Sequence, residues 1–195
     1  MSRNIKITTM HGKKLIVFLA TISLGLVMLY AGKNSTTFAT NNSATNTNGV
    51  THRVVKVIDG DTAEIDIKGQ IKKVRFIGMD TPEVYDPRKP VQCYGREASA
   101  RGHELLEGKM VGLEYDNVVG ETDKYGRSLA YIILPSGEIY NQKMIAEGYA
   151  HEYTYQDQAY KYQSKFKQAE VSAKSLGLGF WGVTTCNGDT KQTAK

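Results

Sequence analysis

Four acidic side chains and one arginine lie close together in the sequence between residues 59 and 83. The acids are Asp59, Asp61, Asp80 and Glu83, and the arginine is Arg75. Proteins bind Ca²⁺ through carboxylate and carbonyl oxygens. A phosphate under nucleophilic attack is stabilised by positive charge directed at its oxygens. The segment therefore contains the residue types that metal-assisted cleavage of a phosphodiester requires.

The first part of this pattern is a candidate metal site. Asp61 and Asp80 each lie at the end of a strand-like run. Aspartates of this kind are also common in ordinary turns, which is the simpler interpretation of each one alone. If the strands form a meander, however, both ends can meet at one rim of a sheet. Proline disfavours helical backbone in the residue before it, so Pro82 can turn the Thr81 carbonyl outward as a further ligand.

The second part of the pattern is a candidate catalytic pair. Glu83 lies three positions beyond Asp80, where a carboxylate can orient a water molecule or accept its proton. Arg75 lies within a predicted strand and can contact a phosphate. Each also has a structural interpretation, Glu83 as an exposed acid and Arg75 as a partner in an ion pair. The combination of these residues with Asp61 favours the catalytic interpretation.

A second basic and aromatic group begins at residue 122. Arg127 together with Arg75 could hold a phosphate by paired hydrogen bonds, a geometry that lysine cannot reproduce. Lys124 and Tyr125 flank Arg127. Further tyrosines follow just before a predicted helix, namely Tyr149, Tyr153 and Tyr155. They can be half-buried strand residues or a platform on which bases stack, and the residues alone support both interpretations equally.

Other catalytic patterns are missing from the sequence. The four histidines are scattered and none has HExxH spacing, which argues against histidine catalysis or a zinc site. The chain also contains neither GxSxG nor a Walker-type loop.

The elements that must position these residues are predicted from periodicity and turn signals. Alternation of Ala63, Ile65 and Ile67 with acids is typical of a half-buried strand. Strands are predicted at 52–58, 62–67, 71–78, 110–115 and 128–134, and helices at 95–107, 141–147 and 157–175. The longest helix has an apolar face made of Ala159, Tyr162, Phe166, Ala169, Ala173 and Leu176. Five antiparallel strands with a helix between the third and fourth predict an α+β fold, a Greek-key barrel of the OB type with three helices.

The two ends of the chain differ from its centre. Residues 1–14 are basic and residues 15–31 are apolar without a charge, which indicates a signal peptide in residues 1–39 with cleavage after Ala39, or an uncleaved signal-anchor. Both alternatives place the remaining domain outside the cytoplasm, as a secreted or a membrane-anchored protein. Residues 33–50 are rich in Asn, Thr and Ser, so 40–50 would be a polar linker after cleavage. The predicted domain is 51–186, with a flexible tail at 187–195.

The net charge of the chain restricts how it can bind nucleic acid. The chain has a net charge of +5, but residues 1–39 hold five basic residues and no acid, leaving 20 basic and 20 acidic residues in the rest. Affinity for nucleic acid must therefore come from local charge.

Cys93 and Cys186 can form one disulfide in an exported domain or remain two unpaired thiols. A zinc site lacks further ligands at suitable spacing.

The motifs together resemble a known family, the thermonucleases, that is, the staphylococcal (micrococcal) nucleases and their relatives. The resemblance covers about residues 52–181. It is carried by Asp59-Gly60-Asp61-Thr62, by Arg75 with Asp80-Thr81-Pro82-Glu83, by Tyr94-Gly95-Arg96-Glu97-Ala98-Ser99-Ala100, and by Thr122 to Arg127 continuing into Leu129-Ala130-Tyr131.

The resemblance implies a Ca²⁺-dependent endonuclease that cleaves DNA and RNA and leaves 3′-phosphate and 5′-hydroxyl ends. It implies that Asp61 and Asp80 bind calcium through their side chains and Thr81 through its carbonyl. It implies that Glu83 activates or positions the attacking water and that Arg75 and Arg127 stabilise the phosphate. The positions that match the nucleotide site are Lys124, Tyr125, Tyr153 and Tyr155.

Two features depart from the family pattern. The best-known member has no cysteine, so a Cys93–Cys186 disulfide does not follow from the resemblance. The loop at 86–90 retains only part of the expected basic charge. One rival hypothesis is a non-catalytic OB-type module that binds single-stranded nucleic acid, which the intact acids Asp61, Asp80 and Glu83 disfavour. A second rival is a cell-surface interaction domain, which only the anchor-like leader favours. We expect a monomer for which no protein partner is implied, with membrane attachment only through the N-terminal segment.

Overall fold

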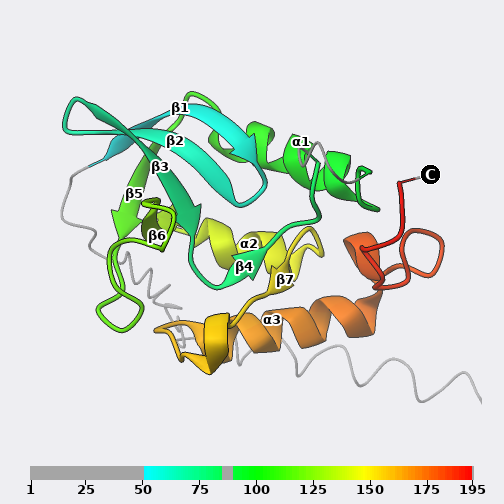
Figure 1. Cartoon of the computed structure of the whole chain (residues 1–195). Coiled ribbons are helices and arrows are strands. Elements are labelled where there is room, and N and C mark those ends of the chain that lie inside the picture. Colours follow the sequence, from blue (N-terminus) through cyan, green and yellow to red (C-terminus); the bar gives the residue numbers. More distant parts are fainter. Residues whose placement is uncertain (1–50, 85–89, 195) are drawn as a thin grey trace, which may run out of the picture. The chain divides into compact units, whose positions relative to one another are not determined.

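A five-stranded barrel forms the centre of the domain. The computed structural model describes residues 51–84 and 90–194. The barrel contains β1 (His52–Asp59), β2 (Thr62–Ile67), β3 (Gln70–Phe76), β5 (Met110–Glu114) and β6 (Ser128–Ile133). Its closed strand order is β1-β2-β3-β6-β5 (Figure 1). The predicted α+β class and OB-type barrel are confirmed.

One pair of strands differs from the prediction of an all-antiparallel barrel. β3 pairs with β6 in parallel, whereas the other barrel pairs are antiparallel. Tight hairpins can join only antiparallel neighbours, but parallel strands need a long connection. The chain between β3 and β6 includes a helix and β5, which is long enough for the parallel arrangement.

Three helices and a small second sheet surround the barrel. The helices are α1 (Gly95–Leu106), α2 (Tyr140–Ala146) and α3 (Gln163–Leu176). A two-stranded sheet pairs β4 (Met79–Asp80) with β7 (His151–Glu152), and short 3₁₀ turns follow, η1 (Tyr155–Asp157) and η2 (Gly179–Trp181). β4 and β7 run between the barrel and α3 in Figure 1. Neither strand was predicted, because two residues carry no periodicity.

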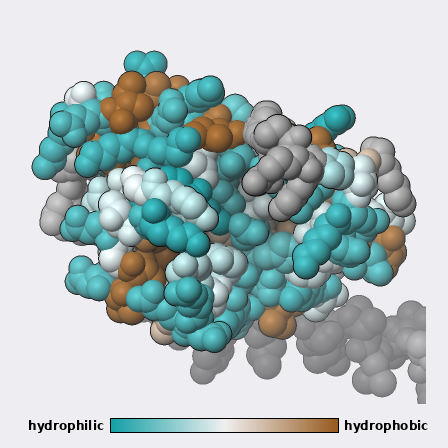
Figure 2. Space-filling model, in the orientation of Figure 1, coloured by the Kyte–Doolittle hydropathy of each residue, from teal (hydrophilic) through white to brown (hydrophobic). Residues whose placement is uncertain are grey.

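The core follows the alternation seen in the sequence. Ala63 and Ile65 of β2 are fully buried, as the half-buried strand pattern predicted. They pack in one cluster with buried side chains from the other strands and from all three helices. The face shown in Figure 2 is mostly hydrophilic, and its hydrophobic residues form small separate patches. Burial of the apolar side chains in the core cluster supplies the main driving force for closing the barrel.

The longest helix begins later than predicted. α3 starts at Gln163 rather than at 157, so Ala159 is exposed and precedes the helix. The reason is a turn in which Gln156 and Asp157 have positive φ angles of 46° and 58°, a conformation incompatible with a helix. Phe166, Ala169 and Ala173 are buried as predicted, and Tyr162 is half-buried. Leu176 was assigned to the apolar face wrongly, because it is 70% exposed at the end of the helix.

The C-terminal residues are not a frayed tail within the described part of the chain. Backbone hydrogen bonds join the Cys93 N–H to the Gln192 oxygen at 2.8 Å and the Ala194 N–H to the Val91 oxygen at 2.9 Å. The sulfur atoms of Cys93 and Cys186 are bonded, with their Cα atoms 6.0 Å apart. The segment after 186 is thus held beside the start of α1, which composition alone does not reveal.

Several sequence-based expectations lie outside the described residues. These are the leader at 1–39, the linker at 33–50 and most of the loop at 86–90. Within residues 51–84 and 90–194, none of the helices combines the length and apolar character needed to cross a membrane.

Candidate active site

The turn between β1 and β2 places Asp61 in a buried position. The Asp61 N–H donates a hydrogen bond of 3.0 Å to the Asp59 carboxylate, which stabilises the turn. Gly60 is required there, because a Cβ at this position would lie 2.6 Å from the Thr81 methyl group. Asp61 is 7% exposed and accepts hydrogen bonds from the Thr62 hydroxyl at 2.9 Å and from the Thr81 N–H at 3.0 Å. The β1–β2 turn and residue 81 therefore form one unit.

Arg75 of β3 lies beside this unit. Its backbone pairs with Thr62 in the antiparallel register of β2 and β3. One terminal nitrogen, Nη2, lies 3.2 Å from Asp61 Oδ2 and 2.8 Å from Asp80 Oδ1. The other, Nη1, donates to the backbone oxygens of Phe76 at 2.9 Å and Met79 at 2.8 Å. Four acceptors thus fix the guanidinium group where the predicted meander brings the two aspartates together.

The site carries more negative charge than Arg75 can neutralise. Burial and the neighbouring Asp61 carboxylate raise the pKa of Asp59 to about 7. Burial and the same neighbour raise the pKa of Asp80 to about 6. Burial alone would lower the pKa of Arg75, but the carboxylates of Asp61 and Asp80 raise it above its usual value. Such mutual repulsion between carboxylates is relieved when a cation binds.

The donor set suits a hard cation. Asp61 and Asp80 offer carboxylate oxygens and Thr81 a backbone carbonyl, the ligand types that calcium prefers. In the described ranges no three or more His, Cys, Asp or Glu side chains are grouped so that they could hold a metal ion. The candidate calcium site differs from such a group, because it would consist of two carboxylates, one backbone carbonyl and water. The residues present therefore fit an oxygen-ligated cation and not a site built from histidine or cysteine.

Glu83 extends the acidic edge beyond β4. It follows Pro82 and is half-buried. Its carboxylate is close enough to contribute to the raised pKa of Asp80. The backbone on both sides of its side chain is held, since the Glu83 N–H donates to Gln92 Oε1 at 2.8 Å and the Val84 N–H donates to Glu83 Oε1 at 3.2 Å. Glu83 is thus held near Asp80 by hydrogen bonds with Gln92 and Val84.

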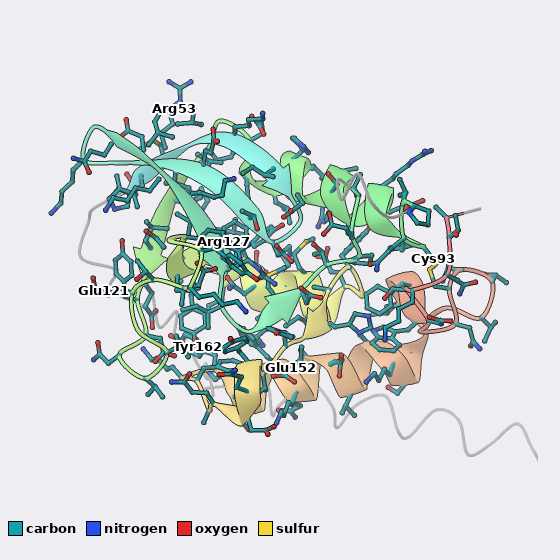
Figure 3. The ribbon with its side chains drawn as sticks, viewed as in Figure 1. Arg53, Cys93, Glu121, Arg127, Glu152 and Tyr162 are labelled. Atoms are coloured by element: carbon teal, nitrogen blue, oxygen red, sulfur yellow. A yellow bond between two sulfur atoms is a disulfide. The ribbon has the colours of Figure 1, made fainter. Side chains whose placement is uncertain are left out.

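A pocket of about 470 Å³ adjoins the acidic edge, and Arg75 and Asp80 line it. It gathers most of the basic and aromatic residues singled out in the sequence, because its lining includes Arg75, Asp80, Lys124, Tyr125, Arg127, Tyr153 and Tyr155. Arg127 lies near the centre of Figure 3. Asp61, Thr81 and Glu83 do not line the pocket, so the predicted residues are divided between an acidic edge and an open cavity that share Arg75 and Asp80.

The aromatic and basic groups within the pocket contact one another. The Arg127 guanidinium carbon lies 5.5 Å and Lys124 Nζ 5.1 Å from the centre of the Tyr125 ring. The rings of Tyr153 and Tyr155 are 6.5 Å apart. The three tyrosines are 43–73% exposed, which leaves their faces accessible to planar ligands. Cations beside exposed aromatic faces form a surface suited to nucleotides.

Tyr149 does not belong to this group. It is half-buried and packs against Tyr94 with ring centres 5.5 Å apart, away from the pocket lining. Its proximity in sequence to Tyr153 was therefore misleading. A tertiary contact with the start of α1 determines its position instead.

Sequence reasoning missed three polar residues that support the site. Asp123 receives the Arg127 Nε–H at 2.7 Å and so orients the guanidinium. Gln158 lines the pocket and donates to the Val118 oxygen at 2.6 Å, and Gln92 contacts Glu83. The four-residue spacing of Asp123 and Arg127 was a usable signal. The other two contacts span 40 and 9 positions and left no local pattern.

Comparison with known proteins adds independent information. A family model described as "Staphylococcal nuclease homologue" matches residues 73–183. A thermonuclease from Staphylococcus hyicus is 43% identical over 136 residues, covering 70% of this chain and 78% of the relative. A thermonuclease from Staphylococcus intermedius is 42% identical over 139 residues, covering 71% and 80% respectively. Endonuclease YncB from Bacillus subtilis is 38% identical over 127 residues, covering 65% and 59%.

Proposed function

This chain belongs to the staphylococcal nuclease family, and we propose that it is an exported, calcium-dependent endonuclease that cleaves DNA and RNA and leaves 3′-phosphate ends. That the protein is a nuclease follows from its family and from the relatives named thermonuclease and endonuclease. Calcium-dependent cleavage is supported above all by the convergence of Asp61 and Asp80 on Arg75, at 3.2 and 2.8 Å.

The acidic edge would hold the cation and the attacking water. Asp61 and Asp80 would bind calcium through their side chains and Thr81 through its carbonyl. Bound calcium would supply positive charge to the phosphate oxygens. Glu83, beside Asp80, would orient a water molecule for in-line attack on phosphorus and accept its proton, with the 5′-oxygen as the leaving group.

The two arginines would bind the phosphate from the pocket side. Both Arg75 and Arg127 line the cavity, and both are oriented by carboxylates before substrate arrives. Such preorganised donors stabilise the charge that develops in the transition state. Lys124 and the exposed rings of Tyr125, Tyr153 and Tyr155 would hold the adjacent nucleotide by charge and stacking.

Export is proposed on two grounds. Residues 1–39 have the composition of a signal peptide or signal-anchor. The bonded pair Cys93–Cys186 is typical of proteins that fold in an oxidising compartment. The protein would therefore act outside the cytoplasm, either secreted or held by its N-terminal segment.

The direct test is cleavage of plasmid DNA and of RNA in the presence of Ca²⁺, Mg²⁺ or a chelator. We expect cleavage that depends on Ca²⁺. In the Glu83→Gln variant the cleavage rate should fall by several orders of magnitude, because glutamine keeps the shape of the side chain but cannot act as a general base. Gln168→Ala, on the exposed face of α3, is the control and should retain activity.

Each outcome has a clear meaning. End analysis of the products should find 3′-phosphates, detected as ends that a polymerase extends only after phosphatase treatment. Binding of single-stranded nucleic acid without cleavage in any metal would instead support a non-catalytic binding module. Cleavage by Glu83→Gln at the wild-type rate would refute the role assigned to Glu83.

A further inference from the structure

We propose that Gln92 is a positioning residue for Glu83, and that the C-terminal segment 191–194, tied down by the Cys93–Cys186 disulfide, holds Gln92 in place. The inference rests on the catalytic role proposed for Glu83. It assigns a function in the reaction to a part of the chain that lies more than a hundred residues beyond Glu83 in the sequence.

Two hydrogen bonds join Gln92 directly to the backbone of Glu83. The Glu83 N–H donates to Gln92 Oε1 at 2.8 Å, and the Gln92 N–H donates to the Glu83 oxygen at 2.9 Å. Both backbone polar groups of Glu83 therefore bond to one residue. Pro82 precedes Glu83 and has a restricted φ angle, which limits the remaining backbone freedom. The direction in which the Glu83 side chain leaves the backbone thus depends on Gln92.

Gln92 is itself anchored from the C-terminal side. It pairs with Thr193 as an isolated β-bridge, and hydrogen bonds from the Cys93 N–H and the Ala194 N–H extend the pairing on both sides. The side-chain amide nitrogen of Gln192, Nε2, donates to the Cys186 backbone oxygen at 2.7 Å, which links this segment to the disulfide. Figure 3 shows the disulfide at Cys93 beside the C-terminal residues.

The disulfide lies in a small apolar cluster that resists displacement. Cys93 is 7% and Cys186 1% exposed, and both pack with the buried Phe180. The rings of Tyr94 and Trp181 cover this cluster. Gln92 is therefore attached to a second, satellite core and not only to a surface loop.

The start of α1 supports Glu83 from another direction. The Gly95 N–H donates to the Gln92 oxygen at 3.0 Å. A Cβ at Gly95 would lie only 2.9 Å from the Glu83 oxygen and 3.3 Å from the Pro82 oxygen, so the helix backbone packs directly on this segment. Glu83 is thus enclosed between α1 and Gln92, and loss of either contact would let it move.

A displaced general base affects the chemical step more than substrate binding. The pocket that would hold the nucleotide is lined by residues of β3, the 119–129 segment and the 153–160 segment, and Gln92 is not among its lining residues. A misplacement of about 1 Å can lower a rate about 100-fold. Loss of the Gln92 acceptor should therefore lower kcat and leave KM nearly unchanged.

The test compares the Gln92→Leu and Gln92→Glu variants of the oxidised protein with wild type, in steady-state cleavage of DNA with Ca²⁺. Leucine retains the approximate size of the side chain without an acceptor, whereas glutamate retains an oxygen at the same reach. We expect kcat of Gln92→Leu to fall about 10- to 100-fold with KM within about twofold. We expect Gln92→Glu to stay within about threefold of wild type, because its carboxylate oxygen can accept the same hydrogen bond from the Glu83 N–H. Gln168→Ala is again the control.

A second arm tests the anchor. The Cys93→Ser/Cys186→Ser pair should also lose kcat, and adding Gln92→Leu to it should cost less than the product of the separate losses, because both changes release the same segment. Losses that multiply in full would show that the disulfide does not act through Gln92 and would overturn this part of the proposal.

The outcomes separate this inference from the proposed function. If wild type cleaves and Glu83→Gln is inactive, but Gln92→Leu keeps kcat within threefold of wild type, the positioning role alone is refuted. Equal loss in Gln92→Leu and Gln92→Glu would also refute it, since the acceptor would then be irrelevant. If Glu83→Gln is as active as wild type, the catalytic assignment is wrong and the positioning role falls with it.

Discussion

At the scale of single residues, Arg75 has both a structural and a proposed catalytic role. It binds two carboxylates and two backbone oxygens at distances of 2.8–3.2 Å, and its side chain is 13% exposed. Asp59 and Asp80 have raised pKa values because each is partly removed from water and lies near the Asp61 carboxylate. A residue that compensates such repulsion cannot be removed without a cost to folding, even if its main function is in the reaction.

We predict that Arg75→Ala destabilises the protein as well as inactivating it. The free energy of unfolding should fall by about 2–4 kcal/mol at neutral pH, because Asp61 is left buried without its cationic partner. Urea denaturation in the presence of a chelator measures this without a contribution from bound metal. Lys143→Ala, which breaks the more exposed pairs with Glu138 and Glu147, should cost less than about 1 kcal/mol. Equal losses in the two variants would contradict the prediction.

At the scale of elements, β7 and α3 together hold the pocket tyrosines. The Glu152 N–H donates to Glu170 Oε1 at 3.2 Å, which ties β7 to α3. The Tyr160 hydroxyl donates to the Glu152 carboxylate at 2.8 Å, and the Tyr153 N–H donates to the Gly78 oxygen at 3.1 Å. These bonds fix the short segment that carries Tyr153 and Tyr155 between two rigid elements. The segment is irregular, so side-chain bonds replace the regular backbone pairing of a strand.

The Glu170 contacts predict a pH-dependent contribution to stability. Burial would raise the pKa of Glu170, but the His151 ring at 3.6 Å and the hydrogen bonds from Lys174 and the Glu152 N–H lower it from 4.5 to about 2. A pKa that is lower in the folded state stabilises the protein above pH 4.5, and this contribution is lost as the pH falls toward 2. Glu170→Gln should therefore be less stable than wild type at pH 6, and the difference should shrink between pH 4.5 and pH 2.

Urea midpoints measured at intervals across this range test the prediction. The exposed Glu104→Gln on α1 serves as a control for the substitution itself and should change stability by less than about 0.5 kcal/mol. A gap between wild type and Glu170→Gln that stayed constant from pH 6 to pH 2 would show that the carboxylate is not selectively stabilised in the folded state.

At the scale of the whole domain, the barrel and the C-terminal segment are joined by one covalent bond. The Cys93–Cys186 disulfide links positions 93 residues apart and so encloses β5, β6, α2 and α3 in one loop. Such a link restricts the unfolded chain, and the restriction increases with loop length. The pocket residues between Val119 and Tyr160 therefore belong to the part of the chain that the disulfide constrains.

We predict that the Cys93→Ser/Cys186→Ser variant loses about 2–4 kcal/mol of unfolding free energy. The measurement is urea denaturation without reductant. Wild type under reducing conditions is the matched control and should lose a similar amount, because it lacks the same link with no change in side-chain volume. A loss below about 1 kcal/mol in both would mean that the C-terminal segment adds little to the stability of the domain.

Features that depend on local patterns could be predicted from the sequence alone. Alternation in residues 62–67 predicted a half-buried strand, since side chains of a strand point to opposite faces. The segments around Asp59-Gly60-Asp61 and Asp80-Thr81-Pro82 marked turns and placed acids at strand ends. The barrel, its main strands and its three helices follow from such signals, because each strand or helix must bury its own apolar face.

Features that depend on contacts between segments distant in sequence could not be predicted and emerge only from the folded structure. The parallel pairing of β3 with β6 and the two-residue strands β4 and β7 arise from closure of the barrel, not from local propensity. The late start of α3 follows from a turn at Gln156 and Asp157. Gln92 is a partner of Glu83 because the chain folds back between residues 83 and 92, and Thr193 pairs with Gln92 from far along the sequence. Periodicity describes which face a residue occupies, but hydrogen bonds between distant segments decide which residues meet.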